Sequence, residues 1–403
     1  MKRFFKALSA VSLAVSIFIY SVIIYGSAVL PDNIELSSQE SFEIGGIYSA
    51  DTDGVVKVGN FTRSESYISQ LTALNLFPVK QVTVNVSKRH YVGLGGDIFG
   101  IKLYTKGVIA VNIDSVTTPS GNISPAEKAD IRKGDNITRI DGKEISSADE
   151  LIKAIENSGG KTLELEVNRK GEHLDLKLQP VMSKDGKFRA GLWVRDSSAG
   201  IGTVTFYDDE NGYFAGLGHG VCDVDTGEIM PLLNGEAVRA TVNGFYKSSA
   251  GDPGELCGVF SDKTIGSLRV NGATGVYGTL DEAKNAKQIP VALASEVREG
   301  AAQIVATVDE SGPQYYDAQI TKVYDDATGE RNLIVKITDR ELLAKTGGIL
   351  QGMSGSPIIQ NSMLVGAVTH VFINDPAQGY GIFAENMIKT ADKLAKEKLQ
   401  SAS

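Results

Sequence analysis

The chain has few cysteines, prolines and histidines, and it has no excess of basic charge. These shortages argue against a disulfide-rich fold, a metal centre and a nucleic-acid partner. Its 403 residues include 2 cysteines, 11 prolines and 4 histidines. Two cysteines cannot build the dense disulfide framework of a small secreted domain, and four scattered histidines predict neither a metal centre nor a metal cofactor. The net charge of −9 argues against nucleic acid as the main partner. The 44 glycines predict many turns and β-structure.

The N-terminus has the composition of an export signal. Lys2, Arg3 and Lys6 precede an uncharged run at residues 7–25, which is long enough to cross a bilayer as a helix. We interpret residues 1–29 as an uncleaved membrane anchor, although Gly26-Ser27-Ala28 would also suit a signal peptidase. The remainder is then expected outside the cytoplasm. In that compartment, Cys222 and Cys257 are compatible with a disulfide or with two free thiols.

Residues 30–88 are predicted to be a linker or a small β-element, and residues 89–182 have a distinct pattern. Ile98-Phe99-Gly100-Ile101 opens a strand, Ser124-Pro125 starts a short helix, Lys133-Gly134-Asp135 precedes a strand, and Asp141-Gly142 makes a hairpin turn.

This order of elements resembles a PDZ domain. The resemblance implies that Ile98, Phe99, Gly100 and Ile101 form the loop that binds a peptide carboxylate, beside a strand edge that accepts the peptide. The groove would bind a ligand peptide, which could be a segment of this chain, or serve as an intramolecular clamp.

From residue 190 to residue 403 the pattern is one of short strands separated by Gly, Asp and Asn. This pattern predicts one β-barrel or a pair of barrels, followed by an amphipathic helix at residues 384–399. The whole chain is therefore expected to be mainly β, with an N-terminal transmembrane helix and an α+β PDZ domain.

A glycine-flanked serine lies near the C-terminus, in Gly352-Met353-Ser354-Gly355-Ser356-Pro357. Glycine on both sides leaves the hydroxyl uncrowded and lets backbone N–H groups approach a ligand, as a nucleophilic serine requires. Taken alone, such a sequence is more often a glycine-rich hairpin with a surface serine.

A serine nucleophile needs a base, usually histidine, and a carboxylate that orients it. Of the four histidines, His219 is framed by Gly218 and Gly220, whereas His370 follows the serine loop and would be structural or line the substrate cleft. The other two are expected at the surface: His90 and His173. The carboxylate is left open by the sequence, among four candidates: Asp223, Asp317, Asp325 and Asp339.

These features together resemble chymotrypsin-like serine peptidases, and in particular the stage IV sporulation protein B peptidases, which are membrane-anchored PDZ peptidases of spore-forming bacteria. The supporting segments include Gly218-His219-Gly220, Ile337-Thr338-Asp339 and Gly347-Gly348-Ile349. The resemblance implies a double β-barrel in which Ser354 is the nucleophile, His219 the base and Asp339 the orienting carboxylate. The oxyanion hole would be the N–H groups of Gly352 and Ser354.

Two departures from the wider chymotrypsin pattern matter. Met353 stands where an acidic residue is usual, so activation by a new N-terminus that pairs with that acid is excluded. Asp339 comes only 15 residues before Ser354, which alters the barrel spacing. Ser356 is a competing nucleophile. The fold resemblance also predicts an apolar specificity pocket around Gly366-Ala367-Val368.

The resemblance implies a serine endopeptidase tethered outside the cytoplasmic membrane, in the space between the forespore membranes. It would cleave itself, and then a membrane-bound inhibitor of an intramembrane protease, so that a late sigma factor is activated. The alternative is a non-catalytic PDZ adaptor with a degenerate protease-like domain. No cofactor is expected beyond the protein groups.

Overall fold

The computed structural model describes residues 2–30, 32–36, 42–44, 46–50, 56–57, 64–87, 89–324 and 329–401. These residues form two compact units, Met1–His90 and Tyr91–Ser403. The candidate carboxylate Asp325 lies outside the described residues. Cys222 and Cys257 both carry free thiols, so the disulfide that the sequence left open is not formed.

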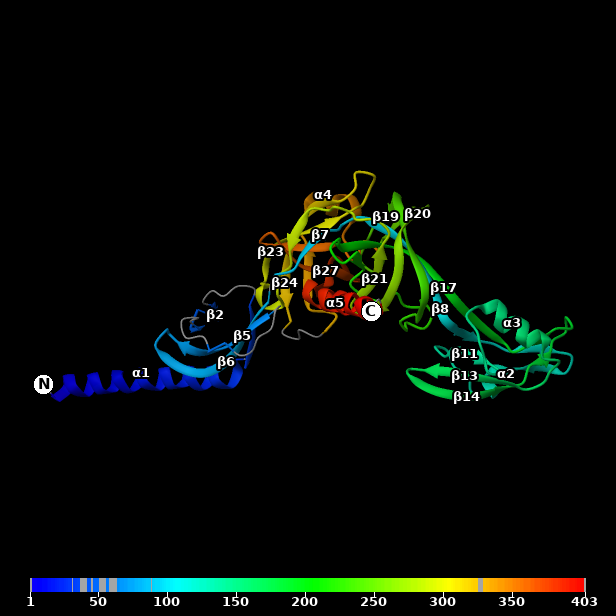
Figure 1. Cartoon of the computed structure of the whole chain (residues 1–403), viewed down its shortest axis with the longest axis horizontal. Helices are drawn as coiled ribbons and strands as arrows, with labels where there is room; N and C mark the ends of the chain where they lie inside the picture. The colour runs from blue at the N-terminus through cyan, green and yellow to red at the C-terminus, as the bar shows by residue number, and fades with distance from the viewer. Residues whose placement is uncertain are drawn as a thin grey trace. The chain divides into compact units, whose positions relative to one another are not determined.

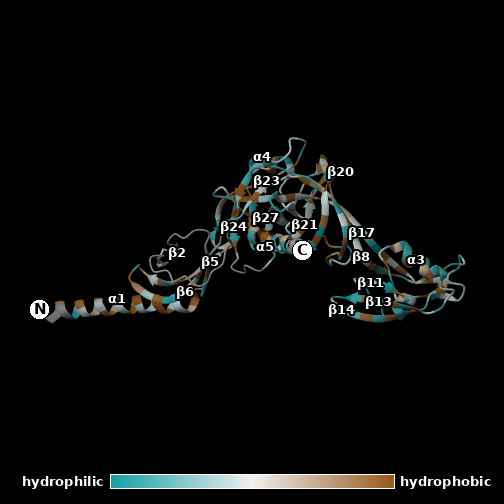
Figure 2. Ribbon diagram, in the orientation of Figure 1, coloured by the Kyte–Doolittle hydropathy of each residue, from teal (hydrophilic) through white to brown (hydrophobic). Residues whose placement is uncertain are grey.

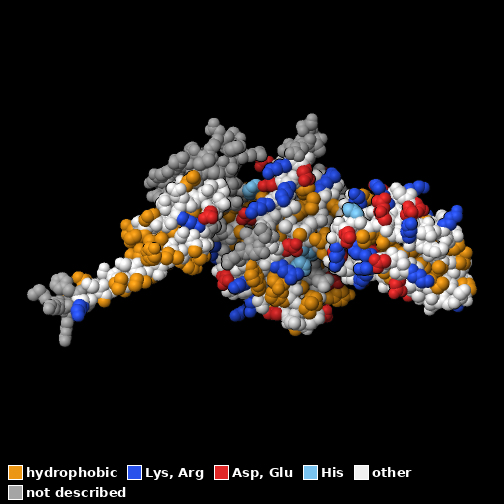
Figure 3. Space-filling model, turned by 90° about the horizontal axis from the view of Figure 1, so that it is seen from below, with side chains coloured by type: hydrophobic (Ala, Val, Ile, Leu, Met, Phe, Trp, Pro, Cys, Tyr) orange, Lys and Arg blue, Asp and Glu red, His pale blue; other side chains and the backbone are white. Residues whose placement is uncertain are grey.

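The first unit begins with an apolar helix and continues into a small sheet. Helix α1 (Lys2–Val29) contains the 22-residue span Leu8–Val29, most of whose residues are exposed, and this span is long and apolar enough to cross a membrane or to act as a signal sequence. Hydrophobic residues recur along this helix (Figure 2), and the space-filling view shows their side chains on its surface (Figure 3). The sheet has the order β1-β6-β5-β3-β2, with β4 on β5. Its strands are β1 (Asn33–Leu36), β2 (Phe42–Ile44), β3 (Tyr48–Ala50), β4 (Val56–Lys57), β5 (Ser64–Ala73) and β6 (Phe77–Ser87).

The PDZ domain belongs to the second unit and has its own apolar core. Its capping-box helix α3 starts after Ser147, whose hydroxyl accepts the Glu150 N–H while the Glu150 carboxylate accepts the Ser147 N–H. Leu151 and Ile155 of this helix are buried against the strands. The elements of the domain are the C-terminal half of β8 (Ile98–Ile113), β9 (Val116–Thr118), β10 (Gly121–Ile123), α2 (Pro125–Lys128), β11 (Asn136–Ile140), β12 (Lys143–Glu144), α3 (Ala148–Asn157), β13 (Leu163–Arg169), β14 (Glu172–Leu178), β15 (Val181–Met182) and β16 (Phe188–Arg189).

Two long strands carry the chain between the PDZ domain and the first barrel. Strand β17 (Leu192–Asp208) pairs antiparallel with β8 over almost its whole length, from Leu192 opposite Ile113 to Thr203 opposite Ile98 (Figure 1). The PDZ domain is thus inserted between two adjacent barrel strands. Because β17 pairs with both β8 and β18, the strands β8, β19, β20, β21, β18 and β17 close into a ring. Its other strands are β18 (Tyr213–Gly216), β19 (Leu232–Tyr246), β20 (Glu255–Gly272) and β21 (Gly275–Leu280), and β7 (Tyr91–Leu94) and β22 (Gln288–Pro290) extend the sheet.

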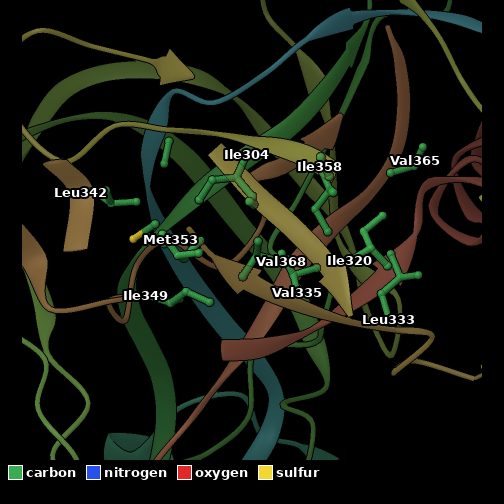
Figure 4. Packing of buried hydrophobic residues seen from close by; sticks show 14 of the residues in the cluster. Ile304, Ile320, Leu333, Val335, Leu342, Ile349, Met353, Ile358, Val365 and Val368 are labelled. Atoms are coloured by element: carbon green, nitrogen blue, oxygen red, sulfur yellow. The ribbon is translucent and has the colours of Figure 1, made fainter. Parts of the chain in front are cut away.

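The second barrel is closed, in the order β23-β24-β25-β28-β27-β26. Its core includes Ile304, Ile320, Val335 and Val368 (Figure 4). The double barrel and the mainly β class predicted from the sequence are confirmed. The elements are β23 (Gly300–Ala306), β24 (Gln314–Val323), β25 (Leu333–Ile337), α4 (Arg340–Thr346), β26 (Pro357–Gln360), β27 (Met363–Phe372), β28 (Asp375–Phe383) and α5 (Ala384–Ser401), and a 3-10 turn (Ala294–Glu296) precedes them.

The predicted carboxylate-binding loop Ile98-Phe99-Gly100-Ile101 is not a loop, and this assignment is corrected. These residues lie in the barrel half of β8, where one edge pairs with β17 and the other with β19. Phe99 is fully buried and packs edge-on against Phe214 of β18. Because both edges of the strand are paired, its backbone N–H and C=O groups are not available to bind an added peptide strand. The barrel therefore begins within the range 89–182 that the sequence pattern assigned to the PDZ domain.

Candidate active site

His219 lies in the loop that follows β18. The backbone enters this loop through two left-handed residues, Leu217 at φ +65° and Gly218 at φ +68°. A Cβ on Gly218 would come within 2.9 Å of the Thr369 side chain, so only glycine allows the loop to pack against the second barrel. The first barrel thereby brings its histidine up to β27 of the second.

The serine loop lies between α4 and β26. Gly352 and Gly355 both have φ +96°, and a Cβ on Gly355 would lie 2.0 Å from the Thr203 carbonyl oxygen. Met353 is fully buried beside Leu342 and Ile349 (Figure 4). The residue that replaces the usual acid therefore anchors the loop in the apolar core.

The two serines of the loop differ in exposure. Ser354 is half-buried, and its hydroxyl donates to the Thr369 carbonyl oxygen at 2.5 Å. Ser356 is 0% exposed, and its hydroxyl oxygen has no hydrogen-bond partner among the described residues. A substrate carbonyl can approach only an exposed hydroxyl, so the structure favours Ser354 over Ser356.

The backbone N–H groups of the loop fall into two sets. Those of Gln351, Met353 and Gly355 each donate to a backbone carbonyl. Those of Gly352 and Ser354 have no acceptor within the described ranges. N–H groups two residues apart beside a serine hydroxyl, with no acceptor of their own, can stabilise an oxyanion.

Two adjacent residues of β27 connect the serine with the histidine. Thr369 accepts the hydrogen bond from Ser354, and the ring of His370 lies against the ring of His219, with centroids 4.4 Å apart and the planes tilted by 34°. Ser354 and His219 thus each contact one of two adjacent residues of the same strand. The sequence had left His370 as a structural or cleft-lining residue, without a role.

The protonation state of His219 follows from its contacts. Its Nδ1 lies 2.8 Å from the Gly220 carbonyl oxygen. Because a carbonyl oxygen can only accept, Nδ1 carries the proton and Nε2 keeps its lone pair. Burial lowers the pKa of His219 below its usual value, against a smaller opposing effect of the Gly220 hydrogen bond. The ring is therefore neutral near pH 7, as a general base must be.

Asp339 is the N-cap of α4, and the structure does not join it to His219. One carboxylate oxygen accepts the Leu342 N–H at 2.9 Å and the other accepts the Asp317 N–H at 3.3 Å. Asp317 is exposed, and Asp223 is buried in an ion pair with Arg195. In the described part of the chain, none of these carboxylates has a recorded hydrogen bond to His219.

Strand β17 supports both the serine loop and the loop of His219, and sequence patterns did not indicate this. The Thr203 N–H donates to the Ser354 carbonyl oxygen at 2.9 Å, and the Thr203 hydroxyl donates to that of Gly352 at 2.9 Å. Further along the strand, Arg195 pairs with Asp223, whose carboxylate closes the turn just beyond His219. The Thr203 contacts join residues about 150 positions apart, so no local signal could have revealed them.

An open cavity of about 520 Å³ adjoins the serine loop. The residues of the predicted pocket, Gly366-Ala367-Val368, do not line this cavity, and Ala367 and Val368 are fully buried in the barrel cores. The lining of the cavity comes from the serine loop, β17 and β20, and includes Ile201, Leu256, Cys257, Phe260, Gln351 and Gly352.

Two family models match the chain. The SpoIVB peptidase S55 family matches residues 186–388, half of the chain, and a PDZ domain model matches residues 100–179. The chain belongs to the SpoIVB peptidase S55 family. It therefore combines a peptidase domain of this family with a PDZ domain.

One named relative matches a short stretch of the chain. A Clostridium perfringens (strain 13 / Type A) protein, provisionally named a zinc metalloprotease, is 30% identical over 69 residues, which are 17% of this chain and 21% of that protein. This chain thus spans about a fifth of that relative's length. Within the described ranges, no group of three or more His, Cys, Asp or Glu side chains could hold a metal ion.

Several solved structures are also similar. The HtrA-type protease AlgW with a decapeptide has a TM-score of 0.28 and 12% identity, over 51% of this chain and 54% of that one. The active form of the Rv3671c protease from M. tuberculosis has a TM-score of 0.23 and 15% identity, over 38% and 71%. The PDZ domain of an SdrC-like protein from Listeria monocytogenes has a TM-score of 0.18 and 22% identity, over 22% and 87%. At these TM-scores the likenesses say nothing about the site.

Proposed function

We propose that the protein is a serine endopeptidase that works through an acyl-enzyme. Ser354 attacks the carbonyl carbon of a peptide bond while Nε2 of His219 takes the hydroxyl proton. The same imidazolium then protonates the leaving amine, and water, deprotonated by His219, releases the acyl group. The observation that carries this proposal is that Ser354 contacts Thr369 and His219 contacts His370, because Thr369 and His370 are adjacent residues of β27.

The N–H groups of Gly352 and Ser354 are proposed to form the oxyanion hole. Their lack of an acceptor within the described ranges supports this role, and so does the half-buried position of both residues. The cavity beside Gly352 offers space for a substrate side chain next to the reacting carbonyl. The family resemblance implies Asp339 as the orienting carboxylate, whereas its own hydrogen bonds, from the Leu342 and Asp317 N–H groups, support the role of an N-cap instead.

The biological role follows from the family resemblance. We propose that helix α1 tethers the peptidase to the cytoplasmic membrane with its barrels outside the cytoplasm, in the space between the forespore membranes. There it cleaves itself and then a membrane-bound inhibitor of an intramembrane protease, which triggers the sigma factor of the late sporulation programme. The apolar span Leu8–Val29, most of whose residues are exposed, supports the tether.

The test compares Ser354→Ala with Ser356→Ala in the full chain, solubilised in detergent. A fluorophosphonate probe is expected to label the wild type and Ser356→Ala, and to leave Ser354→Ala and His219→Ala unlabelled. Ser356 is the matched control because it belongs to the same loop but is fully buried. Labelling that survives in Ser354→Ala would refute the assignment of Ser354 as the nucleophile. An unlabelled wild type would favour the alternative, a non-catalytic PDZ adaptor.

A further inference from the structure

We propose that His370 is a positioning residue for His219, which holds the base in its reactive orientation through contact between the two rings. The proposal rests on the proposed function of His219 as the base. Its starting point is geometric: the two imidazole centroids are 4.4 Å apart and the planes are tilted by 34°. This is the separation of packed aromatic rings.

The imidazole of His219 is held at two places. On its edge, Nδ1–H donates to the Gly220 carbonyl oxygen at 2.8 Å, which selects the tautomer with a free Nε2. A single hydrogen bond still leaves the ring free to tilt about that bond. The ring of His370 covers one face and removes this freedom, which is the task of an orienting group in a serine peptidase.

His370 is itself fixed relative to the nucleophile. It follows Val368 and Thr369, which are 0% and 2% exposed, on β27. The carbonyl of Thr369 accepts the hydrogen bond from Ser354. The dipeptide Thr369-His370 therefore contacts both reacting side chains, so the separation of base and nucleophile depends on the local backbone of β27, at the point where its pairing with β28 shifts register.

The charges around the pair are compatible with this role. Desolvation first, then the neighbouring His219 and the positive charge of Arg331, lower the pKa of His370 to about 4. His370 is therefore neutral near pH 7 and does not oppose the positive charge that His219 acquires during catalysis. Glu330 is the charged group that acts on His219, and it favours the imidazolium.

The experiment measures how fast a fluorophosphonate probe labels Ser354 in the full chain, from pH 4.5 to pH 9, in three variants. His370→Phe keeps a ring over His219, His370→Ala removes it, and His370→Lys replaces it with a positive charge. Because misplacing a catalytic group by about 1 Å costs on the order of 100-fold, we expect His370→Ala and His370→Lys to label about 10- to 100-fold more slowly at high pH. His370→Phe should remain within about threefold.

The pH profile separates positioning from general stability. In the wild type, labelling should rise with pH through an apparent pKa below about 6.5, because burial lowers the pKa of His219. In His370→Ala water reaches the uncovered ring, so the midpoint should move up towards about 6.5. Thermal unfolding should be unchanged within about 2 °C, since His370 is an exposed residue.

Three results would overturn the proposal. One is an unchanged rate and pH profile in His370→Ala. The second is an equal loss in His370→Phe and His370→Ala, which would mean that the imidazole itself, not the ring contact, is needed. The third is an unlabelled wild type, which would refute the proposed function and the role of His370 with it.

Discussion

Asp339 has two possible roles, and its contacts favour one of them. An orienting carboxylate should accept a hydrogen bond from the imidazole of the base. Instead, Asp339 accepts the N–H groups of Leu342 and Asp317, and so begins α4, the helix that leads into the serine loop. An N-cap of this kind stabilises a helix by about 1 kcal/mol.

Two substitutions at this position separate the roles. Asparagine is as good an N-cap as aspartate but lacks the charge. We expect Asp339→Asn to label with the fluorophosphonate probe within about threefold of wild type, and Asp339→Ala to lower the free energy of unfolding by about 1 kcal/mol. Probe kinetics and denaturant unfolding measure the two effects. A loss of about 10⁴-fold in Asp339→Asn would instead establish the carboxylate as the third member of a triad.

At the scale of elements, β8 shows what a local pattern leaves undetermined. Alternating apolar residues predict a strand with one buried face. The middle of β8 alternates in this way, whereas its first four residues, Ile98–Ile101, are all buried. The same alternation suits a barrel strand and the first strand of a PDZ domain, so the pattern could not tell which core receives Phe99. That depends on pairing with β17 and β19, about 100 and 140 residues away.

Substitutions on β8 test its assignment to the barrel. Phe99→Asp would bury an unpaired carboxylate in the barrel core, so we expect loss of folding and of probe labelling, with a destabilisation of at least about 3 kcal/mol. The control is Tyr104→Asp on the same strand, where the side chain is 49% exposed and labelling should persist. If Phe99 belonged to a peptide groove, Phe99→Asp would stay folded and labelled.

At the scale of the whole molecule, glycines and strand spacing predicted most of the architecture. The turns around His219 and Ser354 could be located because their positive φ angles require glycine or favour it. The insertion of the PDZ domain could not, because strand partners that are far apart in sequence are set by tertiary packing. The same holds for His370, whose contact with His219 exists only once the two barrels are joined.

The division into two units leads to a prediction about self-cleavage. Both barrels, the PDZ domain and every proposed site residue lie in Tyr91–Ser403, whereas the apolar helix lies in Met1–His90. A cut between Leu30 and Tyr91 would therefore release a complete peptidase from its tether. We expect such a shortened, released form when the wild type is produced in cells, and only the full-length, membrane-bound chain from Ser354→Ala.

N-terminal sequencing and membrane fractionation of both proteins measure this outcome. Wild type and Ser354→Ala differ by one hydroxyl on a half-buried residue, so any difference in processing reports on the nucleophile and not on the fold. His370→Ala should give an intermediate result, with slower release, because it slows acylation without removing the nucleophile. Equal processing in wild type and Ser354→Ala would mean that another protease makes the cut.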